Sequence, residues 1–374
     1  MKFVSPLLKR AVYPLLHRSG YFSRYAEAGT LSVVTYHGVL PAGYKATDHL
    51  LDGGWVTAAS FRGQLGLLRS RYNVVAPERV RRWCKGEADL PERAVLLTCD
   101  DGLANAVIEM LPILQAEKVP CLFFVTAESL SGSPAMLWYE ELYLTLLAAP
   151  EGPLDGHFSG VPVKGILSNS VRQRHRFWWT LVATASQCEA ESRLGFAKAL
   201  RAHFKMAPDW NLQYLDRKAA RFRLLVPNEI RCLLAGGMAI GSHTTSHPKL
   251  SQLPADLACK EISESRCQLE KSLGTTVWSI AYPFGGVDSV SSRELQMVEN
   301  AGYDCAFTNF GGGFVPAMSR FDIPRMHVTF DMSLSEFEAH LSGFHENLRR
   351  RFGNVEKIPL APASENSVGS APCD

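Results

Sequence analysis

Two histidines four residues apart, His243 and His247, are the residues of this sequence whose types and spacing most directly suggest chemistry. On one turn of a helix, side chains at i and i+4 have roots about 5 to 6 Å apart, so two imidazoles can converge on one metal ion. Zinc normally takes a third protein ligand, often a carboxylate, and keeps open positions for water and substrate. The alternative for an isolated pair is a helix cap beside a surface residue.

A candidate for the third ligand is the adjacent pair Asp100 and Asp101, which follows the apolar run 94–99 and precedes Gly102. Two neighbouring carboxylates beside a cation can divide the work, since the one that binds the ion is neutralised while the other stays free to accept a proton. The structural alternative is a helix N-cap followed by an acidic first turn. The two histidines downstream favour catalysis over that alternative.

Three segments of the chain together resemble the motifs of the NodB-like polysaccharide deacetylases, carbohydrate esterase family four. The family's Thr-Phe-Asp-Asp-Gly is similar to residues 98–102, where Cys99 replaces the aromatic residue, and we interpret that thiol as part of the core. The His-Ser/Thr-x-x-His motif matches residues 243–247, and the motif that ends in Pro-Tyr/Phe-Gly resembles residues 282–285. The resemblance covers roughly residues 31 to 330 and implies a distorted (β/α)7 barrel.

The resemblance also implies a role for each motif residue. Asp101, His243 and His247 would hold a divalent metal, most simply Zn²⁺, and Asp100 would act as the general base. The backbone N–H of Phe284 would donate to the oxyanion that develops during amide hydrolysis. The family's final Leu-x-His motif supplies a general acid, and Met326-His327 matches it in part. The alternative for His327 is a strand histidine that only packs.

One departure from the family concerns the environment of Asp100. The family often carries an arginine upstream in its third motif that contacts the base, whereas the run here is Ser-Ile-Ala-Tyr at 279–282. Arg325, near another predicted strand end, is a candidate substitute. His37 ends the first predicted strand, as a Tyr-His pair does in several relatives, so it either faces the same cleft or is structural.

Strand-like and helical segments alternate along the chain. The predicted strands are 31–36, 74–75, 94–99, 121–126, 239–242, 277–282, 305–308 and 323–328, and the main predicted helices of this alternation are 103–117, 229–234, 255–273, 289–301 and 334–348. Repeated strand-then-helix units argue for a parallel α/β barrel, a TIM-like fold whose chemistry lies at the carboxyl ends of the strands. The candidate site residues all fall at or near such ends.

The alternation is interrupted at about 134–226. Strand-like runs are absent there, and helical stretches rich in Trp, Phe and Arg are predicted at 138–147, 171–185 and 194–204. We interpret this stretch as a helical insertion that overhangs the active face. It can serve as a brace, as buried aromatics at helical spacing usually do, or bind a sugar polymer by stacking.

Composition narrows the class of protein. The chain has 374 residues, 46% of them hydrophobic, and a formal charge of +2, which gives no electrostatic case for nucleic acid as a partner. Nine cysteines without a CxxC pair are typical of an intracellular protein, and no run of 18 apolar residues predicts a membrane span. We therefore expect a cytoplasmic location. The small, polar tail at 359–374 is expected to be disordered.

The N-terminal segment, residues 1–30, is basic and amphipathic, and its first 26 residues contain no acid. It lacks the pattern of a signal peptide, because charges and a proline interrupt its apolar residues. It either packs on the barrel as a docking helix or lies peripherally on the anionic inner face of a membrane.

The sequence thus predicts a metal-dependent hydrolase that removes N-acetyl groups from amino sugars of a polysaccharide or glycan precursor. The alternatives are an O-acetyl esterase or a small cyclic amide hydrolase on the same site, and a catalytically inactive carbohydrate-binding barrel. The departures in the later motifs are the best support for the inactive barrel.

Overall fold

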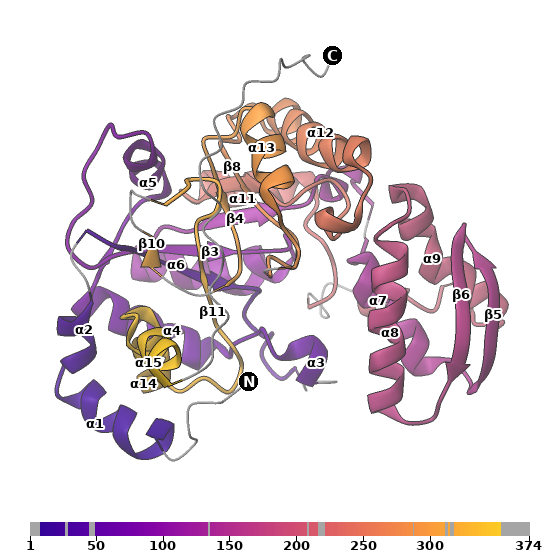
Figure 1. Ribbon diagram of the computed structural model, residues 1–374, viewed down its shortest axis with the longest axis horizontal. Helices are drawn as coiled ribbons and strands as arrows, with labels where there is room; N and C mark the ends of the chain where they lie inside the picture. The colour runs from indigo at the N-terminus through magenta and orange to yellow at the C-terminus, as the bar shows by residue number, and fades with distance from the viewer. Residues whose placement is uncertain are drawn as a thin grey trace.

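Parallel strands curl into a barrel in the computed structural model of the protein, with helices around its outside (Figure 1). The structure describes residues 8–26, 29–44, 49–133, 135–207, 209–215, 221–286, 288–310, 313–314 and 318–352. The parallel strands, in their order across the sheet, are β1 (Leu31–Tyr36), β3 (Ala94–Cys99), β4 (Leu122–Val125), β7 (Ala239–Ser242), β8 (Ser279–Ala281) and β9 (Cys305–Phe307). The (β/α) barrel expected from the sequence is confirmed.

The two edge strands of this sheet, β9 and β1, are connected by the segment that contains the last parallel strand of the chain. An isolated bridge pairs Phe307 of β9 with Ile323, and the chain then enters β11 (Met326–His327), which pairs parallel to β1 through Val34 and Thr35. Two short strands complete the sheet: β2 (Asn73–Val74), parallel to β3, and β10 (Gly313–Phe314), antiparallel to β1. Because the barrel strands are parallel, their carboxyl ends share one rim.

Helices connect the strands and cover the outside of the barrel (Figure 1). In chain order they are α3 (His49–Asp52), α4 (Ala58–Arg71), α5 (Pro77–Cys84), η2 (Ala106–Met110), α6 (Leu111–Glu117), η3 (Ala127–Ser131), α11 (Pro227–Ala235), η5 (Leu250–Gln252), α12 (Ala255–Leu273), α13 (Ser292–Asn300), α14 (Leu334–Leu341) and α15 (Phe344–Phe352). The predicted helix 334–348 is two helices, because Gly343 adopts a left-handed φ of 76° between α14 and α15.

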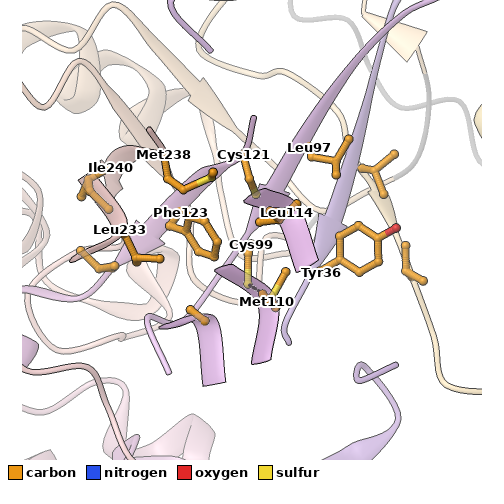
Figure 2. Packing of buried hydrophobic residues seen from close by; sticks show 14 of the residues in the cluster. Tyr36, Leu97, Cys99, Met110, Leu114, Cys121, Phe123, Leu233, Met238 and Ile240 are labelled. Atoms are coloured by element: carbon orange, nitrogen blue, oxygen red, sulfur yellow. Dashed lines mark hydrogen bonds between the residues drawn. The ribbon is translucent and has the colours of Figure 1, made fainter. Parts of the chain in front are cut away.

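Strand β3 is buried on both faces, as a strand of a parallel barrel must be. Leu97 and Cys99 point to the layer between sheet and helices, where Cys99 packs near Met110 and Phe123 (Figure 2). Leu96 belongs to a second apolar cluster, with Phe124 and Phe307 of neighbouring strands. The interpretation of Cys99 as a core residue agrees with this packing, since burial also raises the pKa of its thiol.

The insertion has its own hydrophobic core and lies to one side of the barrel (Figure 1). It contains α7 (Trp138–Ala148), α8 (Val171–Ala185), α9 (Ala190–His203) and α10 (Leu212–Leu215), and also a hairpin of β5 (Gly152–Phe158) and β6 (Val161–Leu167). The expectation of a purely helical insertion was therefore wrong. A bridge between Met136 and Arg223 brings the two ends of the insertion together.

The described part of the N-terminal segment forms η1 (Leu8–Val12), α1 (Tyr13–Arg18) and α2 (Tyr21–Tyr25) and packs on α14. Tyr13 and Phe22 are fully buried against Ala339, and His17 Nδ1 lies 2.5 Å from the Glu338 carboxylate. This packing matches the docking-helix alternative. Among the described residues, no helix is long and apolar enough to cross a membrane. The predicted disordered tail, 359–374, falls outside them.

Candidate active site

The carboxyl rim of the barrel surrounds a cavity of about 280 Å³. Seven of the eight side chains that the sequence singled out line this cavity: His37, Asp100, Asp101, His243, His247, Phe284 and His327. The eighth, Arg325, is fully buried and contacts Asp100. Segments separated by more than two hundred residues thus meet because each follows, or ends, a barrel strand.

Asp101, His243 and His247 form a cluster of potential metal ligands. Asp101 Oδ1 lies 3.5 Å from His243 Nε2 and 3.3 Å from His247 Nε2, and the three ligand atoms lie within 4.8 Å of one another. All three side chains are buried. Burial raises the pKa of the Asp101 carboxyl, but its contacts with the two imidazoles outweigh this and hold that pKa well below its ordinary value. Burial lowers the pKa of His247.

The hydrogen bonding of His243 is what a metal ligand requires. His243 Nδ1 lies 2.7 Å from the Ala281 carbonyl oxygen, which can only accept a hydrogen bond, so Nδ1 carries the proton. In the neutral ring, Nε2 then keeps its lone pair, and it faces Asp101. One carboxylate and two imidazoles are a common donor set for zinc and related divalent ions. The residues present therefore fit a divalent metal.

The two histidines do not lie on a helix, so the expected local structure was wrong. They follow β7 in a loop in which Thr244 and His247 have left-handed φ values of 65° and 55°. The His247 amide donates to Thr244 Oγ1 (3.1 Å), and its carbonyl accepts from Trp138 Nε1 of the insertion (3.1 Å). The loop, rather than a helical turn, makes the imidazoles converge.

Glu261 of α12 holds this loop from the other side. Its Oε2 accepts hydrogen bonds from the backbone amides of Thr245 (3.0 Å) and Ser246 (2.9 Å). Its Oε1 accepts from Arg193 Nη2 of the insertion (2.6 Å), and Arg193 also donates to Ser246 Oγ (2.7 Å). Arg193 and Glu261 are 1% and 5% exposed, so the ion pair is shielded from water. The insertion thus supports the loop that carries His243 and His247.

Asp100 has a different partner from Asp101. Arg325 grips its carboxylate with two hydrogen bonds, Nη1 to Oδ1 at 2.7 Å and Nη2 to Oδ2 at 2.6 Å. Arg325 is itself fixed by a hydrogen bond from Nε to the Thr308 carbonyl (2.9 Å). Burial raises the pKa of the Asp100 carboxyl, but the charge of Arg325 outweighs it, and the net pKa lies below its usual range. Arg325 therefore occupies the place proposed for it as a substitute contact to the base.

The backbone at this turn explains why the two carboxylates diverge. Asp100 N still donates to the Tyr36 carbonyl (2.9 Å), whereas Asp101 already has a left-handed φ of 75°. Gly102 has a left-handed φ of 66°, and a Cβ there would lie 3.0 to 3.1 Å from Val125, so both the backbone and the space favour glycine. The first helical residue is Ala106, five residues beyond Asp101, and the N-cap alternative for the aspartates is wrong.

His327 and His37 lie together at the edge of the cavity, with ring centroids 4.6 Å apart. Asn309 Nδ2 donates a long hydrogen bond (3.4 Å) to His327 Nδ1, which leaves Nε2 as the protonated nitrogen of the neutral ring. Burial, together with the charge of His37, lowers the pKa of His327 to about 3. His327 is therefore neutral near pH 7 in this state, and the Nδ1 of His37 is buried without a partner among the described residues.

Phe284 lies at the turn after β8 with a φ of 61°. Its ring contacts His247 at a centroid distance of 5.0 Å and Tyr139 of the insertion at 5.4 Å. No described residue accepts a hydrogen bond from its backbone N–H. The turn itself is fixed, because Gly285 N donates to Pro283 O and Asn309 N donates to Gly285 O, each at 2.7 Å.

Several cavity residues were missed by sequence reasoning, among them Asn309, Tyr139, Glu140 and Trp179. Asn309 follows β9, so the rule that strand ends converge could have identified it. The other three lie on insertion helices, and only the three-dimensional placement of that insertion brings them to the site. Glu140 is already bound by Arg221, with Oε1 to Nη2 at 2.7 Å.

Comparison with known proteins agrees with this geometry. A polysaccharide deacetylase family profile matches residues 197–306, which include both histidines and the Phe284 turn. This stretch of the chain, just under a third of its length, is therefore similar to polysaccharide deacetylases. The whole chain is 24% identical over 302 residues to the poly-beta-1,6-N-acetyl-D-glucosamine N-deacetylase of Escherichia coli K12, a match that covers 80% of this chain and 38% of that protein. The chain therefore spans about two fifths of the curated relative's length.

Solved structures show the same fold. IcaB from Ammonifex degensii superposes with a TM-score of 0.53 at 18% identity, over 85% of this chain and 98% of that one. The deacetylase PplD of Streptococcus pyogenes, solved in complex with acetate, gives 0.52 at 16% identity over 84% and 99%. The E. coli relative is named as an N-deacetylase, a hydrolase that cleaves the amide bond of an N-acetyl group.

Proposed function

We propose that this chain is a metal-dependent N-deacetylase that releases acetate from N-acetylated amino sugars of a polysaccharide. The observation that carries the proposal is the pairing of an Asp-His-His ligand set with a second buried carboxylate, Asp100, which Arg325 keeps ionised beside it. A protein that only bound carbohydrate would have no need to bury two separately partnered carboxylates, each at a cost in desolvation.

Asp101, His243 and His247 would hold the metal, for which we propose Zn²⁺ because two imidazoles and one carboxylate leave positions open for water and substrate. Such an ion, when bound, polarises the acetyl carbonyl and lowers the pKa of a water molecule. Side-chain and backbone groups of the protein would carry the remaining steps.

Asp100 is the proposed general base, since its carboxylate is ionised and lines the cavity. The Phe284 N–H is the proposed donor to the carbonyl oxygen as negative charge develops there. His327 is the proposed acid for the leaving nitrogen. Because its pKa is about 3 in the free site, His327 is neutral before the reaction. The negative charge of the tetrahedral oxyanion would raise its proton affinity, so that it takes up the proton that Asp100 removed from the attacking water and passes it to the leaving nitrogen.

The proposed substrate class is a polymer of N-acetylglucosamine. The match to a poly-beta-1,6-N-acetyl-D-glucosamine N-deacetylase supports it, as do Tyr139, Trp178, Trp179 and Phe284, which give the cavity the aromatic wall on which sugar rings stack. Acetate in the S. pyogenes deacetylase structure is the expected product of the same reaction.

We also propose peripheral contact with an anionic membrane through the N-terminal segment. Leu15 is 64% exposed and Val12 37% exposed, beside the basic residues Arg10 and Arg18. An apolar ridge flanked by basic residues favours adsorption to anionic lipid.

The test of the proposed function is acetate release from oligomers of N-acetylglucosamine and from O-acetylated sugars, with zinc, with chelator, and with zinc restored. Release from the N-acetyl substrates that chelator abolishes and zinc restores supports the proposal. Release from O-acetyl sugars alone would assign an esterase instead. No release from either, by protein shown to contain metal, would contradict both.

A further inference from the structure

The cavity around the metal ligands is too small for a polymer. Its volume of about 280 Å³ lies just below the range of typical ligand sites, roughly 300 to 1,000 Å³, and leaves room for about one sugar residue. If the substrate is a polymer, as proposed above, its neighbouring residues must leave the cavity along a defined path.

A second cavity, of about 290 Å³, continues from the first. The two cavities share Trp179 of α8 and Phe284, so the aromatic wall of the first is also a wall of the second. The far side of the second cavity is polar and includes Lys249, Gln252 and Asp288. It thus combines an aromatic surface with hydrogen-bonding groups, which is the composition of a sugar-binding site.

Trp179 is both exposed and held in place. It is 44% exposed, while its Nε1 donates to His175 Nε2 (2.9 Å) and its ring packs on Trp178 at a centroid distance of 4.5 Å. The adjacent Trp178 is 3% exposed and donates from Nε1 to the Tyr139 carbonyl (2.8 Å). Trp178 therefore anchors the helix, whereas Trp179 presents a fixed aromatic surface to solvent.

The polar side of the second cavity contains an acceptor without a donor. Gln252 Oε1 is buried and has no hydrogen-bond partner among the described residues. Lys249 and Asp288 form an ion pair at its edge, with Nζ 2.5 Å from Oδ2. A buried acceptor in a natural protein usually has a partner. Because Gln252 lines the cavity, its side chain can turn its oxygen toward a sugar hydroxyl that enters there, and the hydroxyl then donates the missing hydrogen bond.

We propose that the second cavity is a subsite for the next sugar residue of the polymer, with Trp179 as its stacking surface and Gln252 as its hydrogen-bond acceptor. This inference rests on the proposed function for the identity of the polymer. The apolar C–H face of a pyranose packs on the indole while a hydroxyl reaches the amide oxygen. Because each cavity would hold one sugar residue, the two together would favour a polymer over a single sugar.

The test compares chain lengths. The ratio of kcat/KM on a tetramer of N-acetylglucosamine to kcat/KM on the monomer is measured for the wild type, Trp179→Ala and Gln252→Leu. We expect the ratio to fall about 10-fold for Trp179→Ala, because loss of one well-placed aromatic contact typically costs this much binding, and to fall less for Gln252→Leu. Val171→Ala is the matched control, since Val171 is exposed on the same helix and lines neither cavity.

Binding without catalysis separates this inference from the proposed function. Calorimetric titration of metal-free protein with the β-1,6-linked and β-1,4-linked tetramers should give weaker affinity for Trp179→Ala than for the wild type with at least one of them. The subsite would be overturned if Trp179→Ala bound each of the two tetramers as tightly as the wild type does. An unchanged ratio of kcat/KM on tetramer to kcat/KM on monomer would also overturn it. A wild type that binds the tetramer through Trp179 but releases no acetate would refute the deacetylase and leave the subsite standing.

Discussion

Asp100 and Asp101 are neighbours in the sequence, yet each belongs to a different set of interactions. Asp101 turns toward two imidazoles with a left-handed backbone, whereas Asp100 meets a guanidinium in two hydrogen bonds. A metal would neutralise the first carboxylate and leave the second available as a base. The contacts therefore support the assignment of roles that the family resemblance implied.

Asp101→Ala and His247→Ala are each expected to lose metal and activity together, because each removes a metal–ligand bond. Asp100→Asn should keep its metal and lose about 10²- to 10⁴-fold in rate, the usual contribution of a general base. Elemental analysis beside acetate release measures both quantities. Loss of metal from Asp100→Asn, with full occupancy in Asp101→Ala, would reverse the two roles.

His327 provides a prediction about pH. A His pKa lowered from 6.5 to about 3 means that the free enzyme carries neutral His327 from about pH 5 upward. Since kcat/KM reports ionisations of the free enzyme, the profiles of the wild type and His327→Gln should share one shape between pH 5 and 9 and differ only in height. If kcat/KM fell at alkaline pH in the wild type but not in His327→Gln, the pKa of His327 would lie near neutrality instead.

The residue types of the site could be predicted from sequence, but their local geometry could not. His243 and His247 were identified from spacing typical of a helix, yet they converge through a loop with positive φ at Thr244 and His247. Asp–Arg pairing across the barrel, between Asp100 and Arg325, was only a hypothesis because it joins residues 225 positions apart. Such long-range contacts depend on the closure of the barrel.

At the scale of elements, the loop that carries the proposed metal ligands His243 and His247 depends on both the barrel and the insertion. The Glu261 carboxylate accepts from two loop amides and an arginine at once, so its removal leaves buried donors without partners. The insertion is thus coupled to the proposed metal site through Arg193.

We expect Glu261→Ala to weaken zinc affinity about 10- to 100-fold, as removal of groups that orient ligands commonly does, and Glu261→Gln to weaken it less, since an amide oxygen can still accept. The measurement is competition with a chromophoric chelator, which needs no activity. Glu264→Ala is the control, because its carboxylate is exposed on the same helix. Equal zinc affinity in Glu261→Ala and Glu264→Ala would exclude this role.

The membrane contact proposed for the N-terminal segment is better tested by a point substitution than by a deletion. Deletion would expose the apolar surface under Tyr13 and Phe22. Leu15→Glu should instead abolish sedimentation with anionic vesicles and leave the melting temperature unchanged, because Leu15 is exposed. The control is Ile166→Glu, at another exposed position. Sedimentation that persists in Leu15→Glu, or that the wild type never shows, would reject the membrane contact.

The hairpin of β5 and β6 is an element that could not be predicted from the sequence. Pro153, Gly156 and Pro162 lie within its strands, residues that weaken a strand prediction. They are tolerated because the hairpin is a two-stranded sheet with free outer edges. Long apolar strands such as β3 were predicted to the residue, since burial on both faces leaves a continuous hydrophobic run.

For the whole molecule, metal binding should stabilise the fold. A ligand that binds only the native state adds about 2.7 kcal/mol at a hundredfold excess over its Kd. We therefore expect zinc to raise the melting temperature of chelator-treated protein by several degrees, and to leave that of His243→Ala unchanged. Differential scanning calorimetry measures the shift, and an equal shift in both proteins would place the bound zinc elsewhere.

The bridge between Met136 and Arg223 has a consequence for how such a protein can change over evolution. Adjacent strands lie about 4.8 Å apart, so the chain between these two residues leaves and rejoins the barrel at nearly one point. A recombination event could exchange that whole segment without altering the order of the barrel strands. The exchange would bring a new wall for the cavity and, if the proposed substrate is correct, a new choice of polymer, provided that the incoming helix supplied a cation for Glu261.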